Sequence, residues 1–168
     1  MATFSAETPV SAAFSLPLDA DQLNCIGTLA ALWAQLEFIS EIWIYHLRRQ
    51  SFADGRREGV PRDISKRLGK LSALAGDNLS GKHRAAVIAF CDRGLAAAPK
   101  RNLALHGNWM PHHELGIIAA VSWFRVAVDE PYEVLPIDDV PPLVLEVGAL
   151  AQEMLNLLVE RGAEFPSP

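Results

Sequence analysis

Cysteine is scarce in this chain, and its placement excludes two kinds of stabilising framework. The 168 residues contain two cysteines, Cys25 and Cys91, which lie far apart and have no CxxC partner. This spacing indicates neither a zinc site built on paired cysteines nor a disulfide scaffold. Cys91 falls on the apolar side of an expected helix, where a thiol fills the core. We therefore expect a protein of the reducing cytoplasm.

Positive charge is missing from the first 47 residues, which contain no Lys or Arg. A secretory signal begins with a positively charged segment, so no such signal is expected. The same region is long and apolar, but Glu37 and Glu41 lie within it, and a carboxylate is costly at the centre of a bilayer. We interpret it as the core helix of a soluble protein and expect no membrane partner. A glycine-rich phosphate loop and internal repeats are also absent from the sequence.

Half of the residues are apolar, and a chain of 168 residues is long enough to bury one sizeable core. Residues 1–18 hold two prolines and no sustained apolar period, so they predict a loose leader. Residues 19–162 are expected to form a single helical domain, followed by a short tail at 163–168.

Charge is unevenly distributed along the chain. The net charge is −5, yet the stretch from Arg48 to Arg101 holds thirteen basic residues against five acidic ones. The remaining segments are strongly acidic. A basic face attracts a polyanion, while acidic surroundings keep a protein soluble. The alternative interpretation is a pair of solvated helices with Lys and Arg on their outer faces.

The apolar spacing predicts long helices in the first two thirds of the chain. The strongest signal runs from Asp19 to Leu47, with Asp19 or Asp21 as the N-cap. A loop is expected at 51–61, an amphipathic helix with a basic exterior at 62–74, and a third helix from the Ser80 cap to about Ala98. Pro99 should kink or restart the helix, because it lacks an amide donor.

The pattern changes after Gly107. Residues 108–114 are expected to form a loop, and residues 116–128 one or two short strands that pair near 132–135. A last helix is expected from about Asp138 or Pro141 to Arg161, with Gly162 as its stop. The predicted fold class is therefore mainly α, a four-helix up-and-down bundle with a small β hairpin inserted before the last helix.

One stretch, Arg101-Asn102-Leu103-Ala104-Leu105-His106-Gly107, concentrates chemically capable side chains. Arginine carries a permanent, forked positive charge suited to phosphate oxygens, and histidine exchanges a proton near neutral pH. Residues five apart on a helix point away from each other unless the helix ends between them. Gly107, a favoured residue just past a helix end, supplies that stop. The stretch is therefore the main candidate for phosphoryl chemistry.

An arginine, a polar residue and a histidine in this arrangement resemble the signature of the HEPN family, helical bundles that include metal-independent ribonucleases of prokaryotic toxin and defence systems. Looser similarities are the Trp33-x-x-x-Glu37 pattern, the ending His106-Gly107-x-Trp109 and a last helix near the C-terminus. The resemblance implies an endoribonuclease without metal or cofactor, with the motifs of two protomers facing each other in a homodimer. It also implies RNA as substrate and an antitoxin or other protein as partner.

Within this resemblance, the catalytic residues are Arg101, Asn102 and His106. His106 would act as general base or acid, Arg101 would stabilise charge on the phosphoryl oxygens, and Asn102 would orient the histidine or the phosphate. Glu37, on an apolar helix, needs a partner, and Arg101 or His106 is expected to supply it. The expected RNA-binding residues on the basic segment are Arg62, Lys66, Arg67, Lys70 and Lys100.

Other interpretations use the same residues. In a non-catalytic HEPN-like interaction module, Arg101, Asn102 and His106 are structural, and Trp109 and Trp123 dock a partner protein. A metal site built from residues 106, 112, 113 and 114 is disfavoured, because adjacent histidines on a loop often point apart. No metal ligand is therefore assigned.

Overall fold

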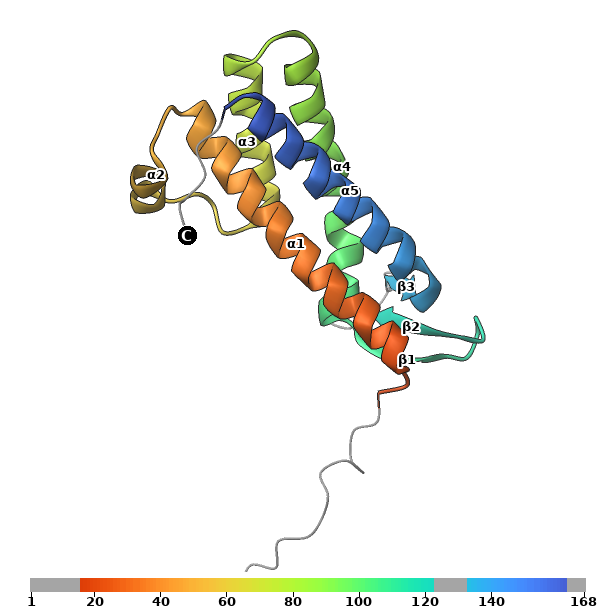
Figure 1. The fold of residues 1–168 in the computed structure, drawn as a ribbon. Coiled ribbons are helices and arrows are strands. Elements are labelled where there is room, and N and C mark those ends of the chain that lie inside the picture. Colours follow the sequence, from red (N-terminus) through yellow and green to blue (C-terminus); the bar gives the residue numbers. More distant parts are fainter. Residues whose placement is uncertain (1–15, 123–132, 163–168) are drawn as a thin grey trace, which may run out of the picture.

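The computed structural model of the chain describes residues 16–122 and 133–162, which form helices and a small antiparallel sheet (Figure 1). The helices in these residues are α1 (Ala20–Leu47), α2 (Phe52–Glu58), α3 (Ile64–Asn78), α4 (Gly81–His106) and α5 (Val140–Glu160), with a 3-10 turn at Ile137–Asp139. The strands are β1 (Asn108–His112), β2 (Ile117–Val121) and β3 (Val134–Pro136), in the order β1-β2-β3. The mainly α class with a β insertion before the last helix is confirmed. Most of the expected leader, the tail and Trp123 lie outside the described residues.

The start of α1 follows from its first residues. Asp19 is the N-cap, and its carboxylate accepts a hydrogen bond from the Gln22 amide at 2.8 Å. The Gln22 side chain in turn accepts from the Asp19 amide at 2.9 Å. This capping box satisfies donors that an uncapped helix leaves without partners. The sequence-based prediction of this helix is confirmed.

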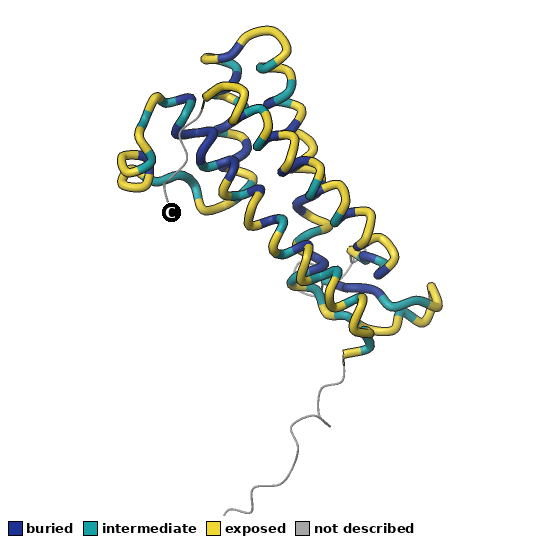
Figure 2. Tube along the Cα trace, in the orientation of Figure 1, coloured by how far each residue is buried: buried dark blue, intermediate teal, exposed yellow. Residues whose placement is uncertain are grey.

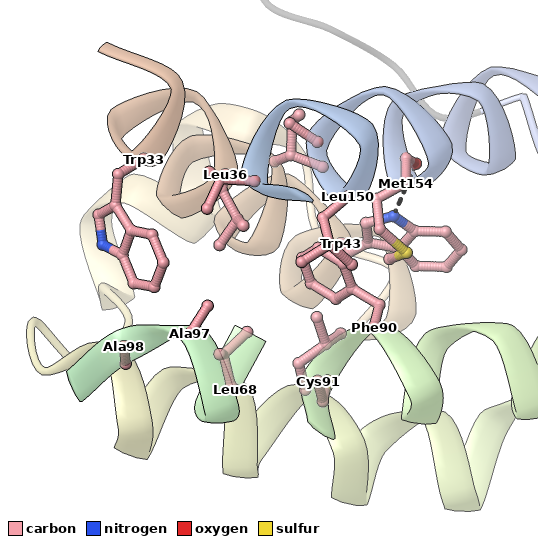
Figure 3. Close-up of a cluster of buried hydrophobic side chains, with 14 of the residues drawn as sticks. Trp33, Leu36, Trp43, Leu68, Phe90, Cys91, Ala97, Ala98, Leu150 and Met154 are labelled. Carbon is pink, nitrogen blue, oxygen red and sulfur yellow. Dashed lines mark hydrogen bonds between the residues drawn. The ribbon is translucent and has the colours of Figure 1, made fainter. Parts of the chain in front are cut away.

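Four long helices enclose the core, and each packs against two others: α1 against α3 and α5, and α4 against α3 and α5. Their buried side chains form one core cluster. Figure 2 shows that buried and exposed positions alternate along each of these helices. Trp33 points from α1 toward Ala98 of α4, and the Trp43 indole N–H donates to the Met154 carbonyl on α5 at 3.2 Å (Figure 3). Burial of these apolar surfaces is the main force that holds the helices together.

The helices do not alternate in direction as an up-and-down bundle requires. α1 and α5 run the same way, with their N-terminal ends near the sheet (Figure 1). Gly148 of α5 accordingly lies beside Leu32 in the first half of α1, while Met154 binds Trp43 in the second half. The up-and-down order was wrong because residues 48–63 lead the chain back along α1 before α3 begins.

Part of that return segment is helical, which corrects the loop expected at 51–61. Ser51 caps α2, its hydroxyl accepting from the Asp54 amide at 3.2 Å. Gly59 ends α2 with a φ of 76°, a conformation that favours glycine. Gly55 suggested a turn in the sequence, but it serves close packing: a Cβ at this position would fall on the Tyr45 ring. Tyr45 itself donates to Glu41, which also pairs with Arg56 at 3.4 Å.

Two further boundaries differ from the sequence-based prediction. α4 continues through Pro99 to His106, so the helix does not restart there. Because Pro99 has no amide hydrogen, the Leu95 carbonyl lacks its usual helical hydrogen-bond donor. Both residues are on the exposed side of α4, where water can replace that donor. Residues 108–112 form β1 and not a loop, because they pair with β2 in an antiparallel register. The expected pairing of β2 with the segment near Leu135 is confirmed.

Two helical segments, Ala20–Leu47 and Ile137–Glu160, are long and apolar enough to cross a membrane by length and composition. Both also supply residues to the common core, among them Trp33 and Trp43 from α1 and Leu150 and Met154 from α5.

We predict that Gly55→Ala destabilises the protein by about 1–3 kcal/mol, because the added methyl group collides with the buried Tyr45 ring. Gly69→Ala on α3 is the matched control, since nothing lies within 4 Å of its added Cβ. Alanine there should stabilise the helix by about 0.5–1 kcal/mol. Urea unfolding followed by circular dichroism measures both, and two changes of the same sign would contradict the packing described for α2.

Candidate functional site

The motif occupies the last two turns of α4, and the sheet determines where that helix ends. The Gly107 amide donates to the Leu103 carbonyl at 2.8 Å, and the chain then turns directly into β1. Gly107 has a φ of −73°, so it is not needed for a left-handed conformation. A Cβ on Gly107 would instead lie 2.5 Å from the Leu103 carbonyl oxygen at the end of α4 and 3.0 Å from the Cβ of Ala120 on β2. The glycine therefore lets the end of α4 approach the sheet closely.

Asn102 and His106 lie one turn apart on α4 and line the same cleft, whose volume is about 520 Å³. Both side chains are exposed. The cleft lies between the start of α3, the end of α4 and the end of the sheet at which β1 begins and β2 ends. Its other lining residues are Asp63, Ser65, Leu95, Ala98, Pro99, Leu103, Gly107, Asn108, Val121, Ser122 and Glu133. The imidazole is therefore open to a ligand and is not enclosed in the core.

Arg101 is half-buried and lies against α1. Its guanidinium carbon is 5.3 Å from the centre of the Trp33 ring, a cation–π contact. Its Nη1 donates to the Asn102 side-chain oxygen at 3.0 Å. Burial lowers the pKa of Arg101, and the nearby negative charge of Glu37 opposes that shift. The guanidinium thus connects the core at Trp33 with the residue that lines the cleft.

Glu37 is held by a different partner from the one expected. Its carboxylate accepts a hydrogen bond from the Trp33 indole N–H at 2.8 Å. Within the described residues, no ion pair joins this carboxylate to Arg101 or His106 at 4.0 Å or less, although its charge acts on Arg101. Trp33 contacts both charged groups: its ring lies against the Arg101 guanidinium, and its indole N–H donates to the Glu37 carboxylate. The sequence places Trp33 and Glu37 one helical turn apart, which permits this contact.

Arg67 is not the exposed RNA-binding residue that the sequence predicts. Its side chain is buried, with 8% exposure. Nε donates to the Pro61 carbonyl at 2.9 Å and Nη1 to the Glu37 carbonyl at 3.1 Å. The helical pattern placed it outside, but the return of the chain at Pro61 covers that face of α3. Arg67 is therefore a structural link between α1, α3 and the segment that joins them.

The other basic candidates remain accessible. Arg62, Lys66 and Lys100 are exposed, and Lys70 is half-buried. Arg62 and Lys66 are sequence neighbours of the cleft residues Asp63 and Ser65, while Lys100 follows Pro99. They lie close to the cleft but do not line it.

The cleft also contains acidic residues that sequence reasoning missed. Asp63 caps α3, its carboxylate accepting from the Lys66 amide at 2.9 Å. Its position before an apolar period was a signal for a helix cap and not for a site. Glu133, just before β3, carried no signal, because only the pairing of β3 with β2 brings it to the cleft.

Trp109 is not a free docking side chain. It is partly buried against the core, and its indole N–H donates to the Ala104 carbonyl at 3.1 Å. This bond satisfies a carbonyl near the end of α4 and fixes β1 to the helix. In residues 16–122 and 133–162, no group of three or more His, Cys, Asp or Glu side chains is arranged to hold a metal ion.

We predict that Arg67→Met lowers the free energy of unfolding by about 1–3 kcal/mol, because the Pro61 and Glu37 carbonyls lose their buried donor. Arg62→Met removes an exposed guanidinium nearby and should change stability by less than about 0.5 kcal/mol. Chemical denaturation of the two variants beside the wild type measures the difference. Equal losses would show that the buried hydrogen bonds of Arg67 contribute nothing.

The cleft therefore presents the His106 imidazole and the Asn102 amide together with the Asp63 and Glu133 carboxylates. Arg101 is not among its lining residues and reaches it only through the hydrogen bond that its guanidinium donates to Asn102. No protein-family model, curated protein or solved structure with which the chain was compared matches it.

Proposed function

We propose that this protein acts on RNA as a metal-independent endoribonuclease of the HEPN-like type, with Arg101, Asn102 and His106 as its catalytic group. The observation that carries the proposal is the shared cleft of Asn102 and His106, with the Arg101 guanidinium 3.0 Å from the Asn102 oxygen. A motif residue pair five positions apart on a helix would normally diverge. Asn102 links the two residues, because its side-chain oxygen accepts a hydrogen bond from Arg101 and it lines the same cleft as His106.

The proposed architecture is a four-helix bundle formed by α1, α3, α4 and α5, with α2 and the sheet as additions. Its support is the packing of each long helix against two others around one core. The bundle is not of the alternating kind. In it, the motif lies where α4 meets the sheet, at the end of the core.

The proposed reaction is transphosphorylation within RNA. The 2′-oxygen attacks the adjacent phosphorus, the bond to the 5′-oxygen breaks, and a cyclic phosphate and a free 5′-hydroxyl result. His106 would take the proton from the 2′-hydroxyl or give one to the departing oxygen, since imidazole serves both roles near neutral pH. Arg101 would stabilise negative charge on the phosphoryl oxygens, and Asn102 would orient the phosphate.

The charges around the cleft indicate how RNA would approach. Asp63 and Glu133 inside the cleft repel phosphate. The RNA backbone would therefore follow the exposed basic residues close to the cleft, Arg62, Lys66 and Lys100. Lys70 would extend this path along α3. Such contacts release counterions, and RNA affinity should therefore fall steeply as salt rises.

A homodimer would complete the site. Transphosphorylation uses one base and one acid, and among the described residues that line the cleft His106 is the one histidine. A second copy facing the first would contribute the second imidazole.

A second candidate function is a non-catalytic interaction module in which the motif is structural. The contact between Arg101 and the Trp33 ring favours it, because a cation stacked on a buried indole can serve stability alone.

We predict that His106→Ala reduces RNA cleavage in EDTA by at least about 100-fold, the usual contribution of a general acid or base. His113→Ala, which removes another exposed histidine in the turn after β1, is the matched control and should cleave like the wild type. Structured and single-stranded RNA are incubated with each purified variant. Equal cleavage by His106→Ala and wild type would identify a contaminating nuclease and favour the interaction module.

We predict that Glu37→Gln lowers cleavage several-fold while leaving the fold intact. The amide oxygen still accepts from Trp33, but the negative charge that acts on Arg101 is removed. If the poorer orientation of Arg101 raises the activation free energy by about 0.5–1 kcal/mol, the cleavage rate falls roughly 2–5-fold. Thermal unfolding and cleavage rates are measured on the same preparations. Wild-type cleavage per folded molecule would show that the Glu37 charge has no part in positioning Arg101.

A further inference from the structure

The cleft beside His106 holds two side chains that phosphate recognition does not use. Its volume of about 520 Å³ is within the range of about 300–1,000 Å³ that small-molecule sites occupy. The described residues that line it include the carboxylates of Asp63 and Glu133 and no Lys or Arg. A carboxylate repels phosphate and accepts hydrogen bonds. The two carboxylates therefore suit a part of the ligand that carries N–H donors.

The sheet positions Glu133 relative to His106. Glu133 precedes β3, and its carbonyl accepts from the Ser122 amide, just after β2, at 3.3 Å. β1 begins at Asn108, two residues after His106, and at this end of the sheet it lies two strands from Glu133. Two strand spacings are about 10 Å. The imidazole and the carboxylate are thus separated along one end of the sheet (Figure 1), with room for the phosphate and the base of one nucleotide.

Both carboxylate oxygens of Glu133 are available to a ligand. The residue is exposed, and among the described residues no hydrogen bond or ion pair engages its side chain. Asp63 differs, because one of its oxygens accepts from the Lys66 amide at 2.9 Å and so caps α3. Glu133 is therefore the carboxylate of this cleft that can receive two parallel hydrogen bonds.

The cleft also has accessible apolar surface. Leu95, which is 36% exposed, and Pro99, also exposed, lie one turn apart on α4 and both line the cleft. Such surface suits the flat face of a ring. Single-stranded RNA presents unstacked bases, and proteins recognise them by contacts to the ring faces and hydrogen bonds to the base edges. The base of a bound nucleotide is thus the part of RNA that fits an apolar surface together with a hydrogen-bond acceptor.

We propose that Glu133 selects guanine, by accepting the N1–H and one N–H of the 2-amino group from the same base. Guanine is the common RNA base with two adjacent N–H donors on one edge, and these match the two oxygens of a carboxylate. Adenine and cytosine carry an acceptor beside the amino group, and uracil flanks its N–H with two carbonyl oxygens. Each of those bases brings a lone pair against the carboxylate. The inference rests on the proposed ribonuclease function and names its substrate class, RNA with guanosine beside the cleaved phosphate.

The test is binding of three fluorescein-labelled pentanucleotides, UUGUU, UUIUU and UUUUU, where I is inosine, measured by fluorescence anisotropy in EDTA. All sugars are 2′-fluoro, so no 2′-hydroxyl can attack phosphorus and binding is measured without cleavage. Inosine lacks the 2-amino group of guanosine. UUGUU should bind about tenfold more tightly than UUIUU, the effect of one hydrogen bond to a charged acceptor, and more tightly still than UUUUU. Equal affinity for the three, or no binding, would overturn the proposal.

Glu133→Gln is the decisive variant. It replaces one acceptor oxygen with an amide donor, so the preference for UUGUU should be lost, while the affinity for UUUUU should not fall because a negative charge is removed. Glu114→Gln removes the same charge from the exposed turn between β1 and β2, outside the cleft, and should keep the preference. Both side chains are exposed, so neither change should affect folding. An unchanged preference in Glu133→Gln would overturn the proposal.

Cleavage of the same three sequences with ordinary ribose separates this inference from the proposed function. If none is cleaved while the guanine preference in binding persists, the ribonuclease function fails and Glu133 still selects guanine in bound RNA. If UUGUU and UUUUU are cleaved at equal rates and bind equally, the guanine preference fails and the ribonuclease function stands.

Discussion

The contact of Trp33 with Arg101 on one side and Glu37 on the other is the interaction on which the candidate site depends. Trp33 is completely buried on α1. Its ring lies against the Arg101 guanidinium, and its N–H donates to the Glu37 carboxylate. An indole separates the two charges and yet stabilises both, because its face is electron-rich and its N–H is a donor. The arginine therefore keeps one orientation, with Nη1 on Asn102.

The same region of α1 is fixed from the other side by Arg67. The Glu37 carbonyl accepts from Arg67 at 3.1 Å and from the Ser40 hydroxyl at 2.7 Å. Ser40 and Arg67 are the polar residues buried in the described part of the core, and both bind this one backbone group. Buried polar groups of this kind define a unique register between helices when their hydrogen bonds are complete. The Arg67 hydrogen bond joins α3 to α1, while the Ser40 hydrogen bond lies within α1 and binds the same carbonyl.

Sequence reasoning was most accurate where a long apolar period determined the outcome. The extents of α1 and α5 and the end of α4 at His106 all follow from helical spacing together with caps such as Asp19 and stops such as Gly107. It was least accurate at short segments. α2 was missed because Asp54-Gly55 resembles a turn, whereas Gly55 is needed to fit beneath Tyr45. β1 was missed because a strand of five residues containing Pro111 depends on its neighbour β2 for stability.

The sequence alone determined the composition of the candidate motif, the helix that carries it and the basic segment around it, because these depend on residue type and local spacing. Tertiary structure alone decided which side chains share a space. It buried Arg67, placed Trp33 between Arg101 and Glu37, and brought Glu133 to the cleft with His106. Such contacts join residues from helices and strands far apart in the chain, and they arise only when the apolar faces of those elements pack against one another.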